Sequence, residues 1–232
     1  MGLFINPRSP GAEAFRTLRT SLHYTADRDS CRVILIASVG PGEGKTVTSC
    51  NLAVSMAQAG DKVLLIDADL RKPRVHRMFG VSNRQGLTNC LVDSVPLNEA
   101  IRESEVPGLF LLTSGPIPPN PAELLDSKRM DAVLLSARDS YDRIVVDSAP
   151  AGPVADATIL ASKSDGVILV VVSGETRIDQ ALEIKETLTR ARGRILGVVI
   201  NKVRFSHSDY QYRYYYHDDK GGRAPVDDRQ RT

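Results

Sequence analysis

A glycine-rich loop between an apolar run and a helix-forming stretch constrains this chain more than any other feature. Residues 33–37 form the continuous apolar run typical of a strand buried on both faces. The loop follows at residues 40–46, and a helical pattern continues to residue 59, where Gly60 ends it. A strand, a glycine loop and a helix in this order bring several main-chain N–H groups to one point, where they attract phosphate. The sequence therefore predicts a phosphate-binding loop.

The residues of this loop have distinct predicted tasks. Lys45 would reach the β- and γ-phosphates of a nucleotide, and the Thr46 hydroxyl would bind Mg²⁺. The strict loop pattern requires glycine at position 39, where this chain has Val39. The loop could be a turn without a ligand, but a Lys-Thr pair that opens a helix has no use in packing. We predict that the phosphates of ATP contact Gly40, Pro41, Gly42, Glu43, Gly44, Lys45, Thr46 and Val47.

Further apolar runs alternate with helical patterns along the chain. The runs are 63–66, 109–112, 143–146, 167–172 and 195–200, and the clearest helical segments are 121–138 and 177–191. Alternating strands and helices predict an α/β fold with a doubly wound, mostly parallel sheet flanked by helices. We expect a P-loop NTPase fold of the MinD/ParA-like kind.

Three aspartates follow strands of this predicted sheet. Asp67 and Asp69 come at the end of the second run, and Asp147 ends the run 143–146. Carboxylates just past the ends of neighbouring parallel strands face the same crevice. A single Asp at a strand end is often a cap or a turn former. Three at the same edge as a phosphate loop indicate the acids that hold Mg²⁺ and orient a nucleophile in phosphoryl transfer.

Charge and cysteine content exclude several classes of protein. The 232 residues carry a net charge of only +2, so composition implies no nucleic-acid or membrane partner. The basic residues Arg71, Lys72 and Arg74 would neutralise phosphate charge, and for Lys72 and Arg74 the alternative is a solvated face. Three cysteines without a CxxC pair suggest buried thiols in a reducing cytoplasm. The apolar run 167–172 is far shorter than the roughly 18 residues of a membrane span.

Several motifs together resemble the bacterial tyrosine kinases, a family of capsule and exopolysaccharide regulators. The stretches 38–46, 63–73 and 144–150 are similar to the Walker A, A′ and B motifs of that family. The resemblance extends to Glu13-x-x-Arg16-x-x-Arg19 and to residues 119–125, and it ends in a tyrosine cluster. It thus covers nearly the whole chain and implies an ATP-dependent, non-specific protein-tyrosine kinase.

The resemblance also implies roles for the site residues. Lys45 and Thr46 would bind phosphate and Mg²⁺, and Asp69 and Asp147 would hold the metal with Thr46. Lys45, Asp67 and Asp69 would be catalytic, with Asp67 activating the attacking tyrosine, because a phenol with a pKa near 10 needs a neighbouring carboxylate or cation.

Two further features have an ordinary and a functional interpretation. Asn201, at the end of the last strand, would contact adenine or simply form a turn. The stripe Glu13, Arg16 and Arg19 lies on a helix that begins at Ser9-Pro10. It would be a solvated face or, as the family implies, the surface that binds the next subunit of a ring near Asn120 and Glu123.

The last segment holds almost no aliphatic residues and is predicted to be a disordered tail. Its tyrosines are Tyr210, Tyr212, Tyr214, Tyr215 and Tyr216, flanked by Asp209, Asp218 and Asp219. Acidic flanks disfavour nucleic-acid stacking, so we predict that the tyrosines are themselves a substrate. The family resemblance implies that a neighbouring subunit phosphorylates the cluster. The chain then divides into a lead-in and oligomerisation helix (1–24), a kinase domain (25–203) and a tail (204–232).

Two rival functions stay open at this point. A MinD/ParA-like regulatory ATPase would carry a second Lys five positions before the loop Lys, where this chain has Gly40. A binding module without catalysis would use ATP only for assembly. The partners that the family resemblance implies are further copies of the chain in a ring, the cytoplasmic segment of a transmembrane activator related to polysaccharide co-polymerases, and a tyrosine phosphatase. Such a protein would be cytoplasmic and recruited to the inner face of the plasma membrane.

Overall fold

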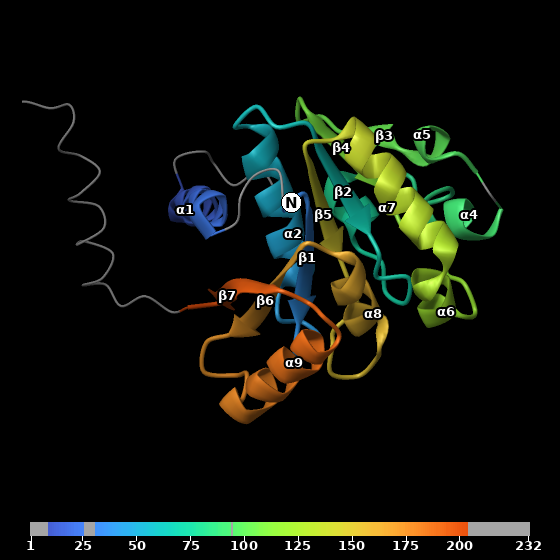
Figure 1. Ribbon diagram of the computed structural model, residues 1–232. Helices are drawn as coiled ribbons and strands as arrows, with labels where there is room; N and C mark the ends of the chain where they lie inside the picture. Colours follow the sequence, from blue (N-terminus) through green and yellow to red (C-terminus); the bar gives the residue numbers. More distant parts are fainter. Residues whose placement is uncertain (1–8, 26–30, 94, 204–232) are drawn as a thin grey trace, which may run out of the picture. The chain divides into compact units, whose positions relative to one another are not determined.

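Seven strands form one sheet in the computed structural model, which describes residues 9–25, 31–93 and 95–203 (Figure 1). They are β1 (Val33–Ser38), β2 (Val63–Asp67), β3 (Arg102–Glu103), β4 (Leu109–Leu112), β5 (Arg143–Asp147), β6 (Gly166–Val172) and β7 (Ile195–Asn201). The order across the sheet is β3-β4-β2-β5-β1-β6-β7, and every pair is parallel except β3 with β4. This confirms the predicted doubly wound fold. The two-residue β3 is too short to produce a sequence pattern.

Helices cover both faces of the sheet, with α2 on the opposite side from α7 and α8 (Figure 1). One layer holds α1 (Pro10–Thr25), α2 (Lys45–Ala57) and α3 (Val75–Phe79). The other holds α4 (Leu87–Val92), α5 (Leu97–Ala100), α6 (Pro121–Asp126), α7 (Lys128–Ser140), α8 (Asp156–Lys163) and α9 (Ile178–Arg190). Successive strand residues face opposite layers, so Ile34 packs under α2 while Leu35 packs under the second layer. Two-sided burial explains why the strands read as continuous apolar runs.

The helix boundaries follow local capping chemistry. Ser9 begins α1 as predicted, because its Oγ accepts the Ala12 amide at 3.2 Å. The single helix expected over 121–138 is wrong: the segment is two helices, α6 and α7, that break at Ser127. Ser127 adopts ψ 154°, and its hydroxyl accepts the Met130 amide at 3.3 Å to cap α7. The hydroxyl replaces a helical hydrogen bond and lets the chain change direction.

Helix α1 is attached to α2 rather than extended away from the fold. Leu22 is buried in the same apolar cluster as the α2 residues Leu52 and Met56. An Arg19 guanidinium nitrogen donates to the Ser55 carbonyl of α2 at 2.7 Å. The three cysteines Cys31, Cys50 and Cys90 are buried and free, which confirms the expected thiols.

Strand register brings two of the predicted acids side by side. Asp67 of β2 pairs with Asp147 of β5 across the parallel ladder. Two positions before Asp67 is Leu65, and two positions before Asp147 is Val145. Both of these apolar side chains face α2. Because side chains alternate along a strand, the two carboxylates lie on the α2 face. The first residue of α2 is Lys45, so the fold sets this lysine near Asp147, 3.9 Å from its Oδ1.

One ion pair fixes the start of the central strand β1. The Asp165 carboxylate accepts the main-chain amides of Arg32 and Val33 at 2.8 and 2.7 Å, and two nitrogens of Arg138 at 2.9 and 2.6 Å. Partial burial acts to raise the pKa of Asp165, but the hydrogen bonds from Arg138 and the two amides outweigh it and lower the pKa below 3.8. Ionised Asp165 therefore joins β1, β6 and α7.

We expect Asp165→Asn to lower the free energy of unfolding by about 1–2 kcal/mol near neutral pH, because an amide cannot accept all four hydrogen bonds. A carboxyl group with a lowered folded-state pKa stabilises the protein above its unfolded pKa, and that stability disappears as the pH falls through the folded pKa. The difference between variant and wild type should therefore vanish as the pH falls below 3.8. Urea unfolding at several pH values measures it.

Asp179→Asn is the matched control for this prediction. Asp179 has the same two-bond geometry with Arg177, at 3.0 and 2.7 Å, but its side chain is 64% exposed. Its loss should leave the unfolding midpoint unchanged at every pH. An equal effect of the two substitutions would show that burial of the Asp165 pair contributes nothing.

Candidate active site

The loop between β1 and α2 is held in shape by its own side chains. Gly42 and Gly44 adopt φ angles of 79° and 99°, which only glycine takes without strain. The Ser38 hydroxyl donates to the Gly40 carbonyl at 2.9 Å, and the Gly40 amide donates to Glu43 Oε2 at 2.9 Å. Thr176 then donates to Glu43 Oε1 at 2.5 Å. A loop fixed before ligand arrival pays little ordering entropy on binding phosphate.

The side chain of Asn201, at the end of β7, is hydrogen-bonded to this loop. Its Nδ2 donates to the Glu43 carbonyl at 2.8 Å. A Cβ atom on Gly44 would lie 2.0 Å from the same nitrogen, so the contact requires glycine at position 44. The end of β7 thus meets the phosphate loop, and Asn201 has a structural task there in addition to its predicted contact with adenine.

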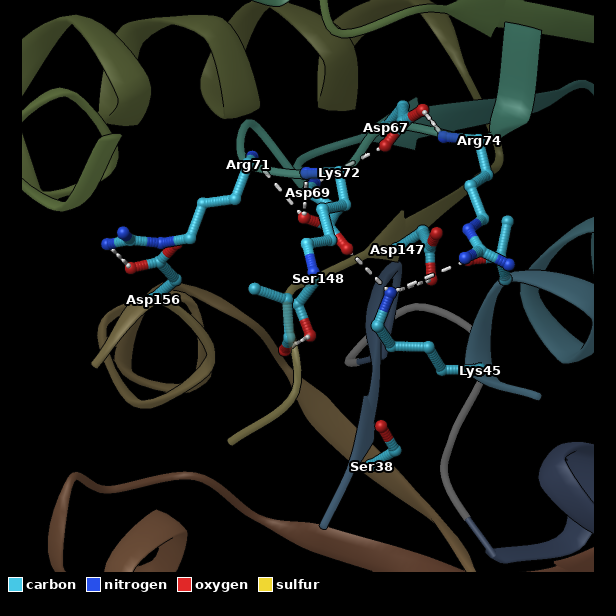
Figure 2. A network of polar contacts seen from close by, with 12 residues as sticks. Ser38, Lys45, Asp67, Asp69, Arg71, Lys72, Arg74, Asp147, Ser148 and Asp156 are labelled. Atoms are coloured by element: carbon cyan, nitrogen blue, oxygen red, sulfur yellow. Dashed lines mark hydrogen bonds and ion pairs between the residues drawn. The ribbon is translucent and has the colours of Figure 1, made fainter. Parts of the chain in front are cut away.

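Lys45 lies between two buried carboxylates (Figure 2). Its Nζ is 2.9 Å from Asp69 Oδ2 and 3.9 Å from Asp147 Oδ1. The Ser49 hydroxyl, one turn along α2, donates to Asp147 Oδ1 at 3.1 Å. A buried carboxylate is stable only when charges or hydrogen bonds compensate for lost water, and Lys45 and Ser49 provide this compensation.

The acid set suits a dication that also has ligands outside the carboxylates. Asp147 is fully buried, and its Oδ2 has no hydrogen-bond partner in the described part of the chain. Burial raises the pKa of Asp147, against the opposing charge of Lys45. Within residues 9–25, 31–93 and 95–203, no three His, Cys, Asp or Glu side chains are arranged to hold a metal alone. Mg²⁺ commonly binds through one or two carboxylates plus water and substrate phosphates, which fits Asp147, Asp69 and the Thr46 hydroxyl.

Asp67 lies deeper than its predicted role requires. It is fully buried, and its Oδ2 accepts the amides of Arg74 and Val75 at 3.1 and 2.9 Å. Burial and the neighbouring Asp147 raise the pKa of Asp67 to about 7. That pKa suits a group that exchanges protons near neutral pH. The main-chain contacts, however, show that Asp67 also holds the loop after β2 in position.

The basic residues after β2 differ in whether they pair with an acid. Arg71 forms two hydrogen bonds with the buried Asp156 at the start of α8, at 2.8 and 2.9 Å (Figure 2). The side chains of Lys72 and Arg74 are exposed. Phosphate neutralisation, the predicted use of Arg71, does not account for its pairing with Asp156.

Sequence reasoning missed three residues that support the site: Ser49, Asp156 and Thr176. Ser49 could have been found, because it lies four residues after Lys45 and so on the same face of α2. Asp156 and Thr176 carry no such signal. Their partners, Arg71 and Glu43, are 85 and 133 residues away in the chain.

The predicted subunit-contact residues lie on two separate surfaces. Glu13 and Arg16 form an ion pair on α1, on the α2 side of the sheet. Asn120 and Glu123 are exposed at the start of α6, in the opposite helical layer. The five tail tyrosines lie outside the described residues, so no geometry bears on them.

Gly44→Ala should weaken the binding of Mg-ADP at least tenfold, because a side chain at position 44 strains the backbone and displaces Asn201. Isothermal titration calorimetry measures the affinity. Gly60→Ala is the control, since Gly60 has a similar φ of 97° but no atom within 4 Å of its added Cβ. Equal losses in the two variants would mean that the Gly44–Asn201 contact is irrelevant to the site.

No helix in the described ranges has the length and apolar character of a membrane span. A protein-family model described as an AAA domain matches residues 31–194, which include the phosphate loop and all three aspartates.

Comparison with known proteins agrees with the site. Tyrosine-protein kinase YwqD of Bacillus subtilis is 45% identical over 207 residues, 89% of this chain and 87% of its own. The solved kinase domain of the Escherichia coli tyrosine kinase ETK has a TM-score of 0.85 and 36% identity, covering 89% of this chain and 81% of that chain. The septum site-determining protein MinD of Pyrococcus horikoshii, solved with Mg-ADP, has a TM-score of 0.65 and 26% identity, covering 77% of this chain and 73% of that chain. On this evidence the chain belongs to the family of bacterial tyrosine-protein kinases.

Proposed function

We propose that this chain transfers the γ-phosphoryl group of Mg-ATP to tyrosine hydroxyls, first to those of its own C-terminal cluster. The observation that carries the proposal is the buried ion-pair group of Lys45, Asp69 and Asp147 directly behind a glycine-shaped loop. A cation between two acids beside a phosphate loop is placed to stabilise the negative charge that develops on the phosphoryl group during its transfer.

Lys45 has the central role in this proposal. Its ammonium group neutralises the carboxylates of Asp69 and Asp147. With nucleotide we propose that Lys45 turns to the β- and γ-phosphate oxygens, while Thr46, Asp69 and Asp147 hold Mg²⁺. The metal supplies charge neutralisation for the transferring group. The main-chain amides of residues 42–47 would bind the remaining phosphate oxygens, since Pro41 has no N–H and the Gly40 amide donates to Glu43.

Asp67 and Asp69 are the proposed acids at the attacking tyrosine. A tyrosine hydroxyl with an ordinary pKa near 10 must lose its proton to react well at neutral pH. The raised pKa of Asp67, about 7 through burial and the charge of Asp147, suits the accepting group. The Oδ2 atom of Asp67 accepts the amides of Arg74 and Val75, whereas Oδ1 accepts only the Asp69 amide at 3.3 Å, so Oδ1 is the oxygen that would take the hydroxyl proton.

We infer that phosphorylation occurs between subunits of a ring. The exposed start of α6 with Asn120 and Glu123, and the α1 stripe with Glu13 and Arg16, lie in different helical layers. Two distinct surfaces of this kind suit head-to-tail contacts, which close into rings. Arg19 would contribute less to such a contact, since it already bonds Ser55. The proposed division is a lead-in and oligomerisation helix (1–24), a kinase domain (25–203) and a substrate tail (204–232).

The wider setting follows from the family. We propose control of capsular or exopolysaccharide synthesis or export, activation by the cytoplasmic segment of a transmembrane co-polymerase-like partner, and reversal by a tyrosine phosphatase. The partner would recruit the chain from the cytoplasm to the inner face of the plasma membrane. The similarity to MinD supports one alternative, a regulatory ATPase without kinase activity. Gly40, where that class has its second lysine, argues against it.

Incubation with Mg-ATP should produce phosphotyrosine on the wild type. Lys45→Met should reduce the signal at least a hundredfold, because methionine has no positive charge to offer the carboxylates or the phosphates. Lys185→Met, on the exposed side of α9, is the matched control and should retain full signal. Immunoblotting and mass spectrometry of the tail measure the outcome, with the activator segment added in parallel. ATP hydrolysis without phosphotyrosine in either condition would favour the MinD-like alternative.

Phosphorylation should also loosen the proposed ring. Each phosphate adds roughly −1.5 to −2 charges, and several on neighbouring tails repel one another. Light scattering should therefore report a smaller particle after Mg-ATP treatment of the wild type. A chain with all five cluster tyrosines changed to Phe should keep its particle size. An unchanged wild-type particle after full phosphorylation would contradict the idea.

A further inference from the structure

A positively charged cavity lies beside the candidate active site. We call it the basic pocket. Its volume is about 460 Å³, and basic or polar side chains form most of its wall. Those that matter here are Arg71, Lys72, Arg74, His76, Arg77 and Asn83. Among the residues that the structure describes, no Asp or Glu lines it. The whole chain carries a net charge of only +2, so this local excess of positive charge is a property of the pocket and not of the surface in general.

The wall of the basic pocket is built by the same loop that holds the catalytic acids. The Lys72 amide donates to Asp69 Oδ1 at 2.9 Å. The Arg74 amide donates to Asp67 Oδ2 at 3.1 Å. The main-chain amides of Lys72 and Arg74 therefore bond the acids, while the side chains of the same two residues line the pocket. If one residue of a peptide bound in the pocket, a tyrosine a few residues along the same peptide would reach Asp67 and Asp69.

Most of the positive charge in the pocket is uncompensated. Arg71 is neutralised by Asp156 at 2.8 Å. Lys72, Arg74 and Arg77 form no side-chain ion pair with any described residue, and all three are exposed. Burial and the charge of Arg77 lower the pKa of His76, as a positive local potential does. Three like charges at one opening attract an anion and repel cations.

We propose that the basic pocket binds the carboxylate side chains of acidic residues that flank the acceptor tyrosine, and so selects acidic tyrosine peptides as substrates. This inference rests on the proposed kinase function. The sequence of the chain supplies one such peptide: residues 205–219 hold the five clustered tyrosines together with Asp209, Asp218 and Asp219, against a single Arg213. Arginine-rich pockets recognise acidic and phosphorylated motifs in the same way.

Fluorescence anisotropy with the full chain tests the docking without any need for catalysis. The probe is a fluorescein-labelled peptide of residues 205–219, compared with the same peptide carrying Asp209→Asn, Asp218→Asn and Asp219→Asn. The wild type should prefer the acidic peptide about tenfold, and high salt should abolish the preference. Because the tail of the chain competes in every mixture, the two peptides are compared on the same protein. Equal affinity would overturn the inference and assign the pocket to another anion.

Charge reversal locates the contact. Arg77→Glu is suited to this, because the Arg77 main chain bonds neither Asp67 nor Asp69. The variant should bind the acidic peptide about fivefold more weakly than the wild type and should gain affinity for a peptide with Lys at the three Asp positions. Arg102→Glu, on the exposed strand β3, is the matched control and should behave as the wild type. An undiminished preference for the acidic peptide in the Arg77 variant would contradict the proposal.

Kinetics with the same peptides separate docking from chemistry. For the wild type, the KM of the Asn peptide should exceed that of the acidic peptide about tenfold, while kcat changes less than about twofold. Failure of the wild type to phosphorylate either peptide, with activator present, would contradict the kinase function. The anisotropy preference would still decide the docking. The peptide comparison uses the unmodified protein, so it does not depend on the folding of any variant.

Discussion

The ion-pair group of Lys45, Asp69 and Asp147 is the interaction on which the rest of the site depends. Two carboxylates that are almost wholly buried lie at the end of a parallel sheet, and the ammonium group between them is the nearest compensating charge. Without it, each acid would have to take up a proton or draw in water. Lys45 can hold this position because it is the first residue of α2 and the loop before it is tightly shaped. In the proposed mechanism, a bound dication would replace Lys45 between the two acids and free it for phosphate.

A second layer of contacts joins distant parts of the sheet to this centre. Asn201 connects the end of the edge strand β7 to the phosphate loop, and Thr176 connects the turn after β6 to Glu43. On the other side, Arg71 and Asp156 connect the loop after β2 to the start of α8. Phosphate loop, acids and basic pocket therefore lie on one supported edge. A substrate that enters the basic pocket would contact the loop whose amides hold Asp67 and Asp69, so substrate selection and catalysis would share one structural element.

Much of the fold was predictable from the sequence, because strands buried on both faces produce unbroken apolar runs. All six long strands were identified in this way. The acids at strand ends were also predictable, since parallel strands present their carboxyl ends at one edge. The break at Ser127 was not predicted, because the apolar spacing continues across it and only the capping hydrogen bond to Met130 reveals it. Asp67 was expected to contact the substrate. Its carboxylate is instead buried and accepts amides seven and eight residues further along the chain, which the sequence does not reveal.

The sequence by itself determined the fold class, the phosphate loop and the acids, because each depends on short-range patterns: apolar runs, glycine positions and residues that end strands. It also pointed to the family through motifs whose order and spacing are fixed. Only the tertiary structure decided which groups compensate one another. Arg71 pairs with Asp156, whereas Lys72, Arg74 and Arg77 of the basic pocket have no ion pair with another described residue. Compensation of charge depends on distance in space, and residues such as Glu43 and Thr176, far apart in the chain, become neighbours only when the sheet has formed.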